Sequence, residues 1–146
     1  DLDPIMLGLS IPGSTFLARA YSGQPAQLLD LTLAALKHTA EGGGMSYLEV
    51  LSPCVTYNDT YRDWRTSVYD VDAEEGYDPT NRAAAFTRMQ ELREEKRLPL
   101  GLIFKGQRHA LESVALNKDF PAPALQDIGR PDISGVCNDA LQSFIR

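Results

Sequence analysis

The stretch GSTFLARAYSGQPAQLLDLTLAALKHTAEGGGMSYLEVLSPC, residues 13–54, decides the fold of this chain. Residues 14–20 form a short, mostly apolar run behind a Pro-Gly pair, and residues 46–52 form a second such run. Runs of this length and composition are typical of β-strands. The sequence therefore predicts two strands with one intervening element.

The intervening segment has the periodicity of an amphipathic helix. Pro25 stands near a first-turn position, where its missing backbone N–H costs nothing. Leu29, Leu33 and Leu36 recur at the i, i+4, i+7 spacing of one helix face. Three consecutive glycines, residues 42–44, then end the helix.

A second helix and a third strand follow further along the chain. Asp78 is suited to cap a helix and Pro79 to occupy its first position, which predicts a helix over about residues 79–96. Residues 98–104 resume strand character. The order strand, helix, strand, helix, strand predicts an α/β fold, a parallel sheet with flanking helices. The buried stripe of the second helix should consist of Ala85, Met89 and Leu92.

Two segments lie outside this pattern. The connection over residues 57–78 is too long for an ordinary loop between a strand and a helix, so we expect a mobile segment that covers a functional site or a subunit interface. Residues 117–146 hold three prolines and no long period, apart from a short helix near residues 138–145. We therefore divide the chain into a domain over residues 1–116 and an extension over residues 117–146 that packs on the domain or on a partner.

Composition and charge exclude several classes of function. The net charge is −6, and the 14 Lys and Arg residues form no cluster, which argues against partners such as nucleic acid or an anionic membrane surface. No apolar run approaches the length of a membrane span. We therefore expect a soluble, cytoplasmic protein, in which the sequon at Asn58 has no meaning.

Cys54 is the residue that most invites a chemical interpretation. It follows the second predicted strand at once, after Ser52 and Pro53. Ligands gather beyond the carboxyl ends of the strands in open parallel sheets, so this position favours a functional thiol. The alternative is a buried structural cysteine that packs as a small hydrophobe. The other cysteine, Cys137, is distant in sequence, and cytosolic thiols usually stay reduced.

Other side chains give weaker signals. His38 and His109 are the only imidazoles, and because nothing in the spacing brings either to Cys54, we expect both to be solvated surface residues. Two cysteines and two scattered histidines match no zinc spacing. An acidic run lacks the pattern of a calcium loop and is expected to be a solvated loop; it consists of Asp70, Asp72, Glu74 and Glu75.

Several of these stretches together resemble a known family. GSTFLAR and SPCVTYN are similar to 2-oxoacid:ferredoxin oxidoreductase β subunits, in which a GATFVAR-type strand leads through one helix to a strand ending in SPCVTFN or a near variant. DPTNRAAAF and LPLGLIF are similar to a later helix and strand of that family. The resemblance covers roughly residues 3–104, and the order and spacing of its elements make it more specific than any single motif.

The resemblance implies a role for Cys54. The β subunit of the family binds thiamine diphosphate and Mg²⁺ and carries a 4Fe-4S cluster, and by resemblance Cys54 supplies the fourth thiolate of that cluster. Thiolates suit iron–sulfur clusters, whose potentials respond to backbone N–H groups of the kind that a turn after a strand supplies. Thr56 and Asn58 follow closely enough to support that ligand. The chain would then be half of a thiamine diphosphate-binding domain.

The departures from the family pattern limit this implication. The family's Gly-Asp-Gly stretch with its downstream Asn, and its three upstream cysteines, do not occur here. The resemblance therefore implies the carboxyl-terminal half of a β subunit. Alone, such a chain should be catalytically inert and should bind little or no thiamine diphosphate, Mg²⁺ or iron.

The implied reaction is the oxidative decarboxylation of a 2-oxoacid with coenzyme A and electron transfer to ferredoxin, in a complex with an α subunit. We favour 2-oxoglutarate, because SPCVTYND with its aromatic-rich continuation resembles that branch most. Pyruvate and branched-chain 2-oxoacids remain open. The alternative, from a different class, is a non-catalytic α/β module used for assembly or binding.

Overall fold

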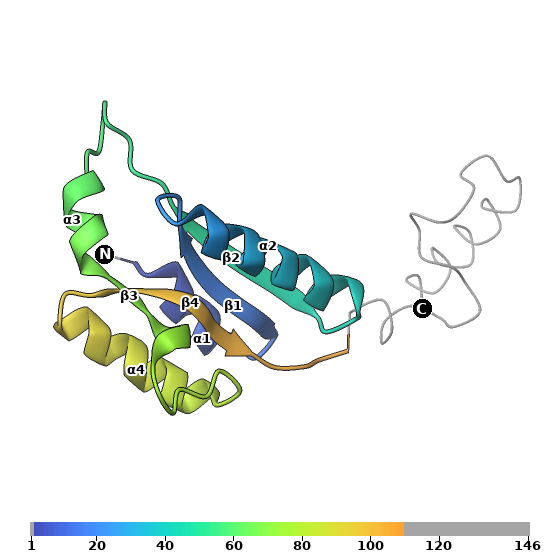
Figure 1. Cartoon of the computed structure of the whole chain (residues 1–146). Coiled ribbons are helices and arrows are strands. Elements are labelled where there is room, and N and C mark those ends of the chain that lie inside the picture. Colours follow the sequence, from blue (N-terminus) through green and yellow to red (C-terminus); the bar gives the residue numbers. More distant parts are fainter. Residues whose placement is uncertain (1, 110–146) are drawn as a thin grey trace, which may run out of the picture. The chain divides into compact units, whose positions relative to one another are not determined.

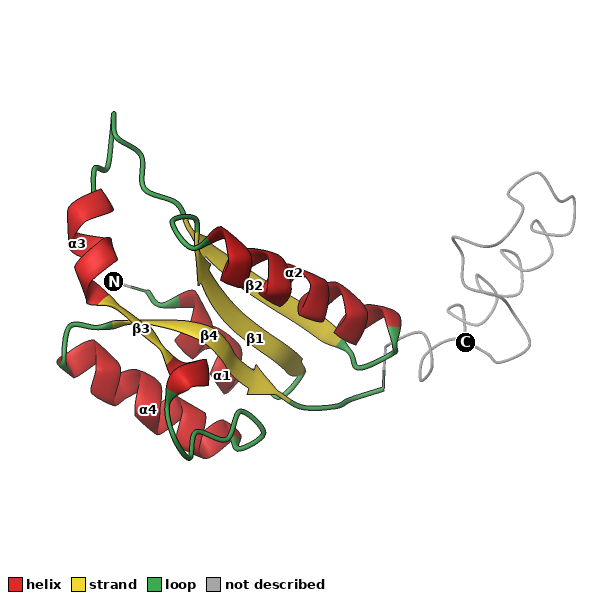
Figure 2. Ribbon diagram, viewed as in Figure 1, coloured by secondary structure: helices red, strands yellow, loops and turns green. Residues whose placement is uncertain are grey.

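The computed structural model describes residues 2–109. In this part of the chain, four strands form one sheet in the order β2-β1-β4-β3, with helices on both faces (Figures 1 and 2). The strands are β1 (Ser14–Tyr21), β2 (Met45–Leu51), β3 (Val68–Asp70) and β4 (Leu98–Lys105). The helices are α1 (Pro4–Ser10), α2 (Pro25–Ala40), α3 (Tyr61–Ser67) and α4 (Arg82–Glu94), with a 3₁₀ turn η1 (Val71–Ala73).

The α/β class is confirmed, and the sheet is mostly parallel. β1 pairs with β2 in parallel, and β3 pairs with β4 in parallel. The central pair differs from the wholly parallel order that we expected, because β4 runs antiparallel to β1. The cause is β3, an unpredicted strand that turns the chain round before α4, so that α4 connects β3 to β4 rather than β2 to β4.

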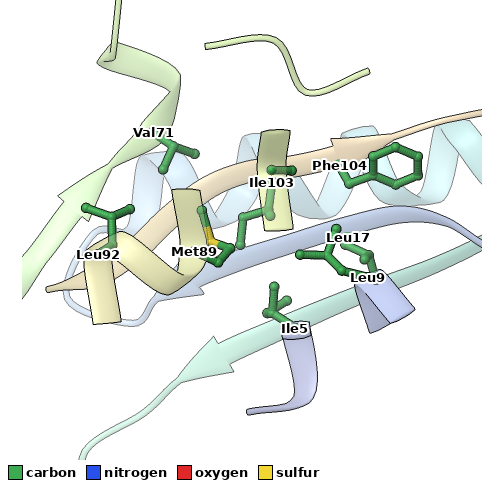
Figure 3. Packing of buried hydrophobic residues seen from close by; sticks show 9 residues of the cluster. Ile5, Leu9, Leu17, Val71, Met89, Leu92, Ile103 and Phe104 are labelled. Carbon is green, nitrogen blue, oxygen red and sulfur yellow. The ribbon is translucent and has the colours of Figure 1, made fainter. Parts of the chain in front are cut away.

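Two apolar clusters hold the layers together. α2 covers one face of the sheet, and α1 and α4 cover the other (Figure 1). β1 is buried along its whole length because it is covered on both faces. The cluster on the α2 side consists of Phe16, Ala18, Ala20, Leu31 and Ala35. The cluster on the α1 and α4 side, shown in Figure 3, consists of Ile5, Leu9, Leu17, Val71, Ala85, Met89, Leu92, Ile103 and Phe104.

The two predicted helices are present, with differences in detail. Ala85, Met89 and Leu92 are buried, as predicted for α4. That helix begins later than expected, because Asn81 accepts a hydrogen bond from the Ala84 amide and caps it. The Asp78 carboxylate instead accepts from the amide and hydroxyl of Thr80.

The sheet-facing side of α2 is not the side that carries the predicted stripe. Leu31 and Ala35 pack against the sheet. The periodic leucines lie outward and are 58%, 56% and 63% exposed at Leu29, Leu33 and Leu36. The spacing therefore predicted the helix correctly but did not predict its buried face.

The segment over residues 57–78 is more ordered than we expected. It contains α3, β3 and η1 in succession, and β3 joins the sheet. Tyr77 is tied to the sheet as well, since its hydroxyl donates to the Ile103 carbonyl over 2.7 Å. Another element that we did not predict is α1, which Asp3 caps through the amides of Ile5 and Met6.

Some expectations fall outside this part of the structure. No helix within residues 2–109 is long and apolar enough to cross a membrane. The boundary at residues 116 and 117, the extension that follows it, the short helix near residues 138–145 and Cys137 lie outside the described residues.

Candidate functional site

Cys54 lies in a short, closed loop directly after β2. Its amide donates to the Asn58 carbonyl over 3.1 Å, and the Asn58 amide donates back to the Cys54 carbonyl over 2.8 Å. These two bonds form an isolated antiparallel bridge between Cys54 and Asn58. Pro53 favours the extended backbone that leads from β2 into this loop, because its ring fixes φ and it has no N–H to continue the ladder. Residues 54–58, called the Cys54 loop below, therefore turn back on themselves at the end of a strand.

The closed loop directs backbone N–H groups at the thiol. The pKa of the Cys54 thiol is lowered, chiefly by the backbone N–H of Thr56 and then by that of Tyr57. Desolvation opposes these two amides and ranks next in size, and the backbone N–H of Asn58 and the hydroxyl of Thr56 lower the pKa by lesser amounts. Donors of this kind stabilise the thiolate, which is the form of cysteine that binds metals and attacks electrophiles. The Cys54 loop thus favours the thiolate form of its cysteine.

The exposure of the loop decides between the two interpretations of this cysteine. Cys54 is a free, exposed thiol, so the alternative of a buried structural cysteine is wrong. Two neighbours are exposed as well, Val55 at 74% and Tyr57 at 92%. Thr56 and Asn58 lie beside the sulfur, yet both act on the thiol through their backbone amides, and only Thr56 adds its side chain. Their role at a cofactor stays a prediction.

A group of aromatic rings holds α3, the helix after the Cys54 loop, against the sheet. The ring of Tyr21, at the end of β1, lies edge-on to the rings of Tyr61 and Trp64, with centroids 6.3 Å and 6.5 Å away. Gly23 permits this arrangement, because a Cβ there would lie 2.3 Å from the Tyr21 ring. α3, which follows the Cys54 loop in the chain, is therefore anchored to β1, the strand next to β2.

The remaining candidates do not join Cys54. His38 is buried, not solvated as predicted, because α2 turns it toward the sheet, where its Nε2 lies 3.1 Å from the Thr15 hydroxyl. His109 is exposed, as expected of a surface residue. Within residues 2–109, no group of three or more His, Cys, Asp or Glu side chains could hold a metal ion. A metal centre with three or more such ligands at Cys54 would therefore take at least one of them from outside these residues.

The acidic run is used for structure rather than forming only a solvated loop. The Asp72 carboxylate accepts the backbone N–H of Leu102 in β4 over 3.1 Å. Glu74 pairs with Arg88 on α4 over 3.0 Å. Partial burial against β4 raises the pKa of Asp72, and the charge of Asp70 adds to that rise, while the Leu102 amide opposes it.

One contributor to the site was missed by sequence reasoning. The amide of Tyr57 is second only to that of Thr56 in lowering the pKa of the thiol. Every residue except proline has a backbone N–H, so the residue type does not reveal such a donor. The available signal was the turn itself. A proline and a cysteine directly after a strand, followed by short polar residues, indicate a chain that reverses and presents successive N–H groups.

The Cys54 loop coincides with the start of a family match. Residues 54–117 match the family model for the C-terminal region of the pyruvate ferredoxin oxidoreductase β chain. The β subunit of 2-oxoacid:ferredoxin oxidoreductase 2 from Aeropyrum pernix is 31% identical over 132 residues, which is 83% of this chain and 40% of that protein. The β subunit of oxidoreductase 1 from the same organism is 32% identical, over 92% of this chain and 46% of that protein.

A solved structure shares the fold. It is a 2-oxoglutarate:ferredoxin oxidoreductase from Magnetococcus marinus, solved with 2-oxoglutarate, coenzyme A and succinyl-CoA bound. The superposition has a TM-score of 0.65 at 24% identity and covers 93% of this chain and 44% of that one. The chain spans less than half the length of the relatives that it matches. Over that span, it is similar to the β subunits of 2-oxoacid:ferredoxin oxidoreductases.

Proposed function

We propose that this chain is the carboxyl-terminal part of a β subunit of a cytoplasmic 2-oxoacid:ferredoxin oxidoreductase, and that Cys54 binds its 4Fe-4S cluster. One observation carries the proposal: an exposed thiol lies at a strand end, under backbone N–H groups that lower its pKa. The same residue begins the family match. Relatives that are 31% and 32% identical over most of this chain support it.

The residues of the Cys54 loop fit one thiolate ligand of such a cluster. The Cys54 sulfur is exposed, so it could bind a cluster without any rearrangement of the core. The amides of Thr56 and Tyr57 are already directed at it, and such hydrogen bonds stabilise the charge on a ligating sulfur and tune cluster potentials. The Asn58 backbone closes the loop through two hydrogen bonds with the Cys54 backbone. When bound, the cluster would supply single-electron transfer.

The described residues do not fit the other expected cofactors. No group of three or more His, Cys, Asp or Glu side chains within residues 2–109 could hold a metal ion, and Asp72 is engaged with a backbone amide of β4. We therefore assign no ligand of thiamine diphosphate or Mg²⁺ to these residues. Both groups would be held by the remainder of the enzyme, which would also include an α subunit and act on coenzyme A and ferredoxin.

The proposed reaction is the oxidative decarboxylation of a 2-oxoacid with formation of an acyl-coenzyme A. We favour 2-oxoglutarate as the substrate, on the resemblance of residues 52–59 and the aromatic segment after them. That segment includes Tyr61 and Trp64, which hold α3 against β1. Comparing turnover of 2-oxoglutarate and pyruvate by the purified complex would decide this point. Faster turnover of pyruvate would contradict the substrate assignment alone.

The test of the cluster assignment uses two cysteine variants of the complete β subunit, each purified together with its partner. Cys54→Ala should lower iron and acid-labile sulfide per β subunit, remove the electron paramagnetic resonance signal of the reduced cluster and abolish ferredoxin reduction. Cys137→Ala, the matched control, lies outside the family match and should retain all three. Full iron and an unchanged signal in Cys54→Ala would overturn the assignment.

A further inference from the structure

The outward face of α2 carries an uninterrupted apolar seam. Ala26, Leu29, Leu33, Leu36 and Ala40 recur at alternating steps of three and four residues. This is the a/d pattern of a helix that packs against another helix. All five residues are exposed, and each of the three leucines is more than half exposed, at 58%, 56% and 63%. These five residues are called the α2 seam below.

The α2 seam is separate from the core contacts of the same helix. Leu31, Ala35 and His38 are the buried residues of α2 and lie on its sheet side. At 100° per residue, the seam points almost directly away from them. Figure 1 shows α2 lying along the sheet as the outermost layer on its face. A contiguous apolar stripe in that position has the character of an interface rather than of scattered surface leucines.

We propose that the α2 seam pairs with the α2 seam of a second copy of this chain, in an antiparallel arrangement about a two-fold axis near Leu33. The seam reads the same from both ends, alanine, leucine, leucine, leucine, alanine. Reversal therefore places Leu33 against the partner's Leu33, Leu29 against the partner's Leu36, and Ala26 against the partner's Ala40. An isologous interface needs this self-complementarity.

The flanking charges match the same arrangement. Asp30 and Lys37 lie on one flank of the seam, each one position after a seam leucine. A two-fold axis perpendicular to the helices brings that flank against the same flank of the other copy. Asp30 then faces the partner's Lys37, and Lys37 faces the partner's Asp30. Glu41, which caps the end of α2, lies 3.8 Å from Lys37, and because both side chains are largely exposed, Lys37 can also bind the partner's Asp30.

A parallel pairing would not use these charges. Its two-fold axis would run along the helices and bring this flank against the opposite flank of the other copy, which carries Thr32 and Thr39, so Asp30 and Lys37 would face no opposite charge. The charge pattern thus selects the antiparallel pair of two copies.

The size of the seam predicts a weak dimer. One pair of 16-residue helices falls at the small end of specific interfaces, which begin at roughly 1,200 Å² of total buried surface. We therefore expect a reversible monomer–dimer equilibrium with a dissociation constant on the order of micromolar.

The test is sedimentation velocity of the 146-residue chain across a concentration series from below to above the micromolar range. The wild type should shift from monomer to dimer. Leu33→Glu should remain a monomer throughout. Leu7→Glu, which changes a 48% exposed leucine on α1, is the matched control and should dimerise like the wild type. Circular dichroism of each variant confirms that the helices are retained.

Exchanging the charges of Asp30 and Lys37 tests whether a second copy of this chain binds the α2 seam. Asp30→Lys alone should weaken dimerisation about tenfold, since it turns two attractive pairs into repulsive ones. Adding Lys37→Asp should restore the wild-type dissociation constant, because the pairs are then attractive with their signs reversed. A monomeric wild type, or a double variant no tighter than Asp30→Lys, would overturn the proposal and would point to a different protein as the occupant. Neither result depends on the assignment of Cys54.

Discussion

The Asp3 carboxylate binds the guanidinium of Arg19 at 2.6 Å and also caps α1, accepting the Ile5 amide over 2.9 Å through the same oxygen. Arg19 is buried in β1, and its Nε donates to Glu49 of β2 over 2.7 Å. Arg19 and Glu49 are direct neighbours in the parallel register of the two strands. One buried cation therefore joins a helix start and two strands.

Asp3→Ala should lower the free energy of unfolding by about 3 kcal/mol, because it removes a helix cap and leaves Arg19 with one carboxylate. Asp3→Asn should cost less, since the amide oxygen can still cap α1. Urea denaturation of both variants measures the difference. Equal losses in the two variants would show that the charge of Asp3, and not its cap, carries the effect.

Gly101→Ala should destabilise the sheet by about 2 kcal/mol or more. Gly101 has φ of +105°, and a Cβ there would lie 2.6 Å from Oδ2 of Asp72. Gly42→Ala is the matched control, because Gly42 also has a positive φ, +76°, but open space around it. Gly101→Ala should lose more stability than the control in thermal and urea unfolding. The difference between the two variants measures the cost of the close contact with Asp72.

Arg82→Lys should cost about 2 kcal/mol, although it preserves the charge. The Arg82 guanidinium donates to the carbonyls of Leu9 and Ile11, both at 3.0 Å, and to that of Ser14, and it lies over the Phe104 ring. A lysine ammonium cannot reach this spread of acceptors. Arg65→Lys, on the exposed side of α3, should be neutral in the same denaturation assay.

The pH dependence of stability should carry a contribution from Asp72. Its folded-state pKa is raised above the ordinary 3.8, so the folded chain holds the proton to a higher pH than the unfolded chain does. Stability should therefore fall as pH rises from 3.8 through the raised value and then level off. Asp72→Asn should remove this fall while retaining an acceptor for the Leu102 amide. Identical slopes for wild type and variant would contradict the assignment.

The chain alone should bind neither thiamine diphosphate nor iron. No group of three or more His, Cys, Asp or Glu side chains able to hold a metal exists within residues 2–109, and a 4Fe-4S cluster requires four ligands. Calorimetric titration with thiamine diphosphate and Mg²⁺ should show no heat of binding, and the purified chain should be colourless. Micromolar binding or stoichiometric iron would show that the site has been misplaced.

The sequence predicted most of the elements but less of their arrangement. β1, α2, β2, α4 and β4 were predicted because each carries a local signal, an apolar run or a helical period. The direction of β4 could not be predicted, since it depends on the three-residue strand β3, which is too short to show a period. The buried face of α2 was predicted wrongly because the helix carries apolar residues on both of its sides. The exposed side has the larger set of apolar residues at helical spacing, Leu29, Leu33 and Leu36, so the sequence pattern pointed to that side.

The place of Cys54 after a strand was predicted correctly, but the groups that act on its sulfur were not, and its role at a cofactor stays a prediction. Cys54 was identified from its place after a strand. The donors that act on its sulfur are mainly backbone amides of Thr56 and Tyr57, and their direction follows from the bridge between Cys54 and Asn58. Backbone geometry of this kind follows from the closed turn and not from the identity of any one side chain.

β2 stands last in the strand order among the described residues, paired through one side only. Its sequence, MSYLEVL, contains a single charged residue, Glu49, and Arg19 already binds that carboxylate. Such an edge lacks the lysines and prolines that normally discourage foreign strands from adding to a sheet. At high concentration, the isolated chain should therefore be prone to associate edge to edge through β2, visible as light scattering that rises with concentration. Val50→Lys, at a position that is 42% exposed, should suppress it.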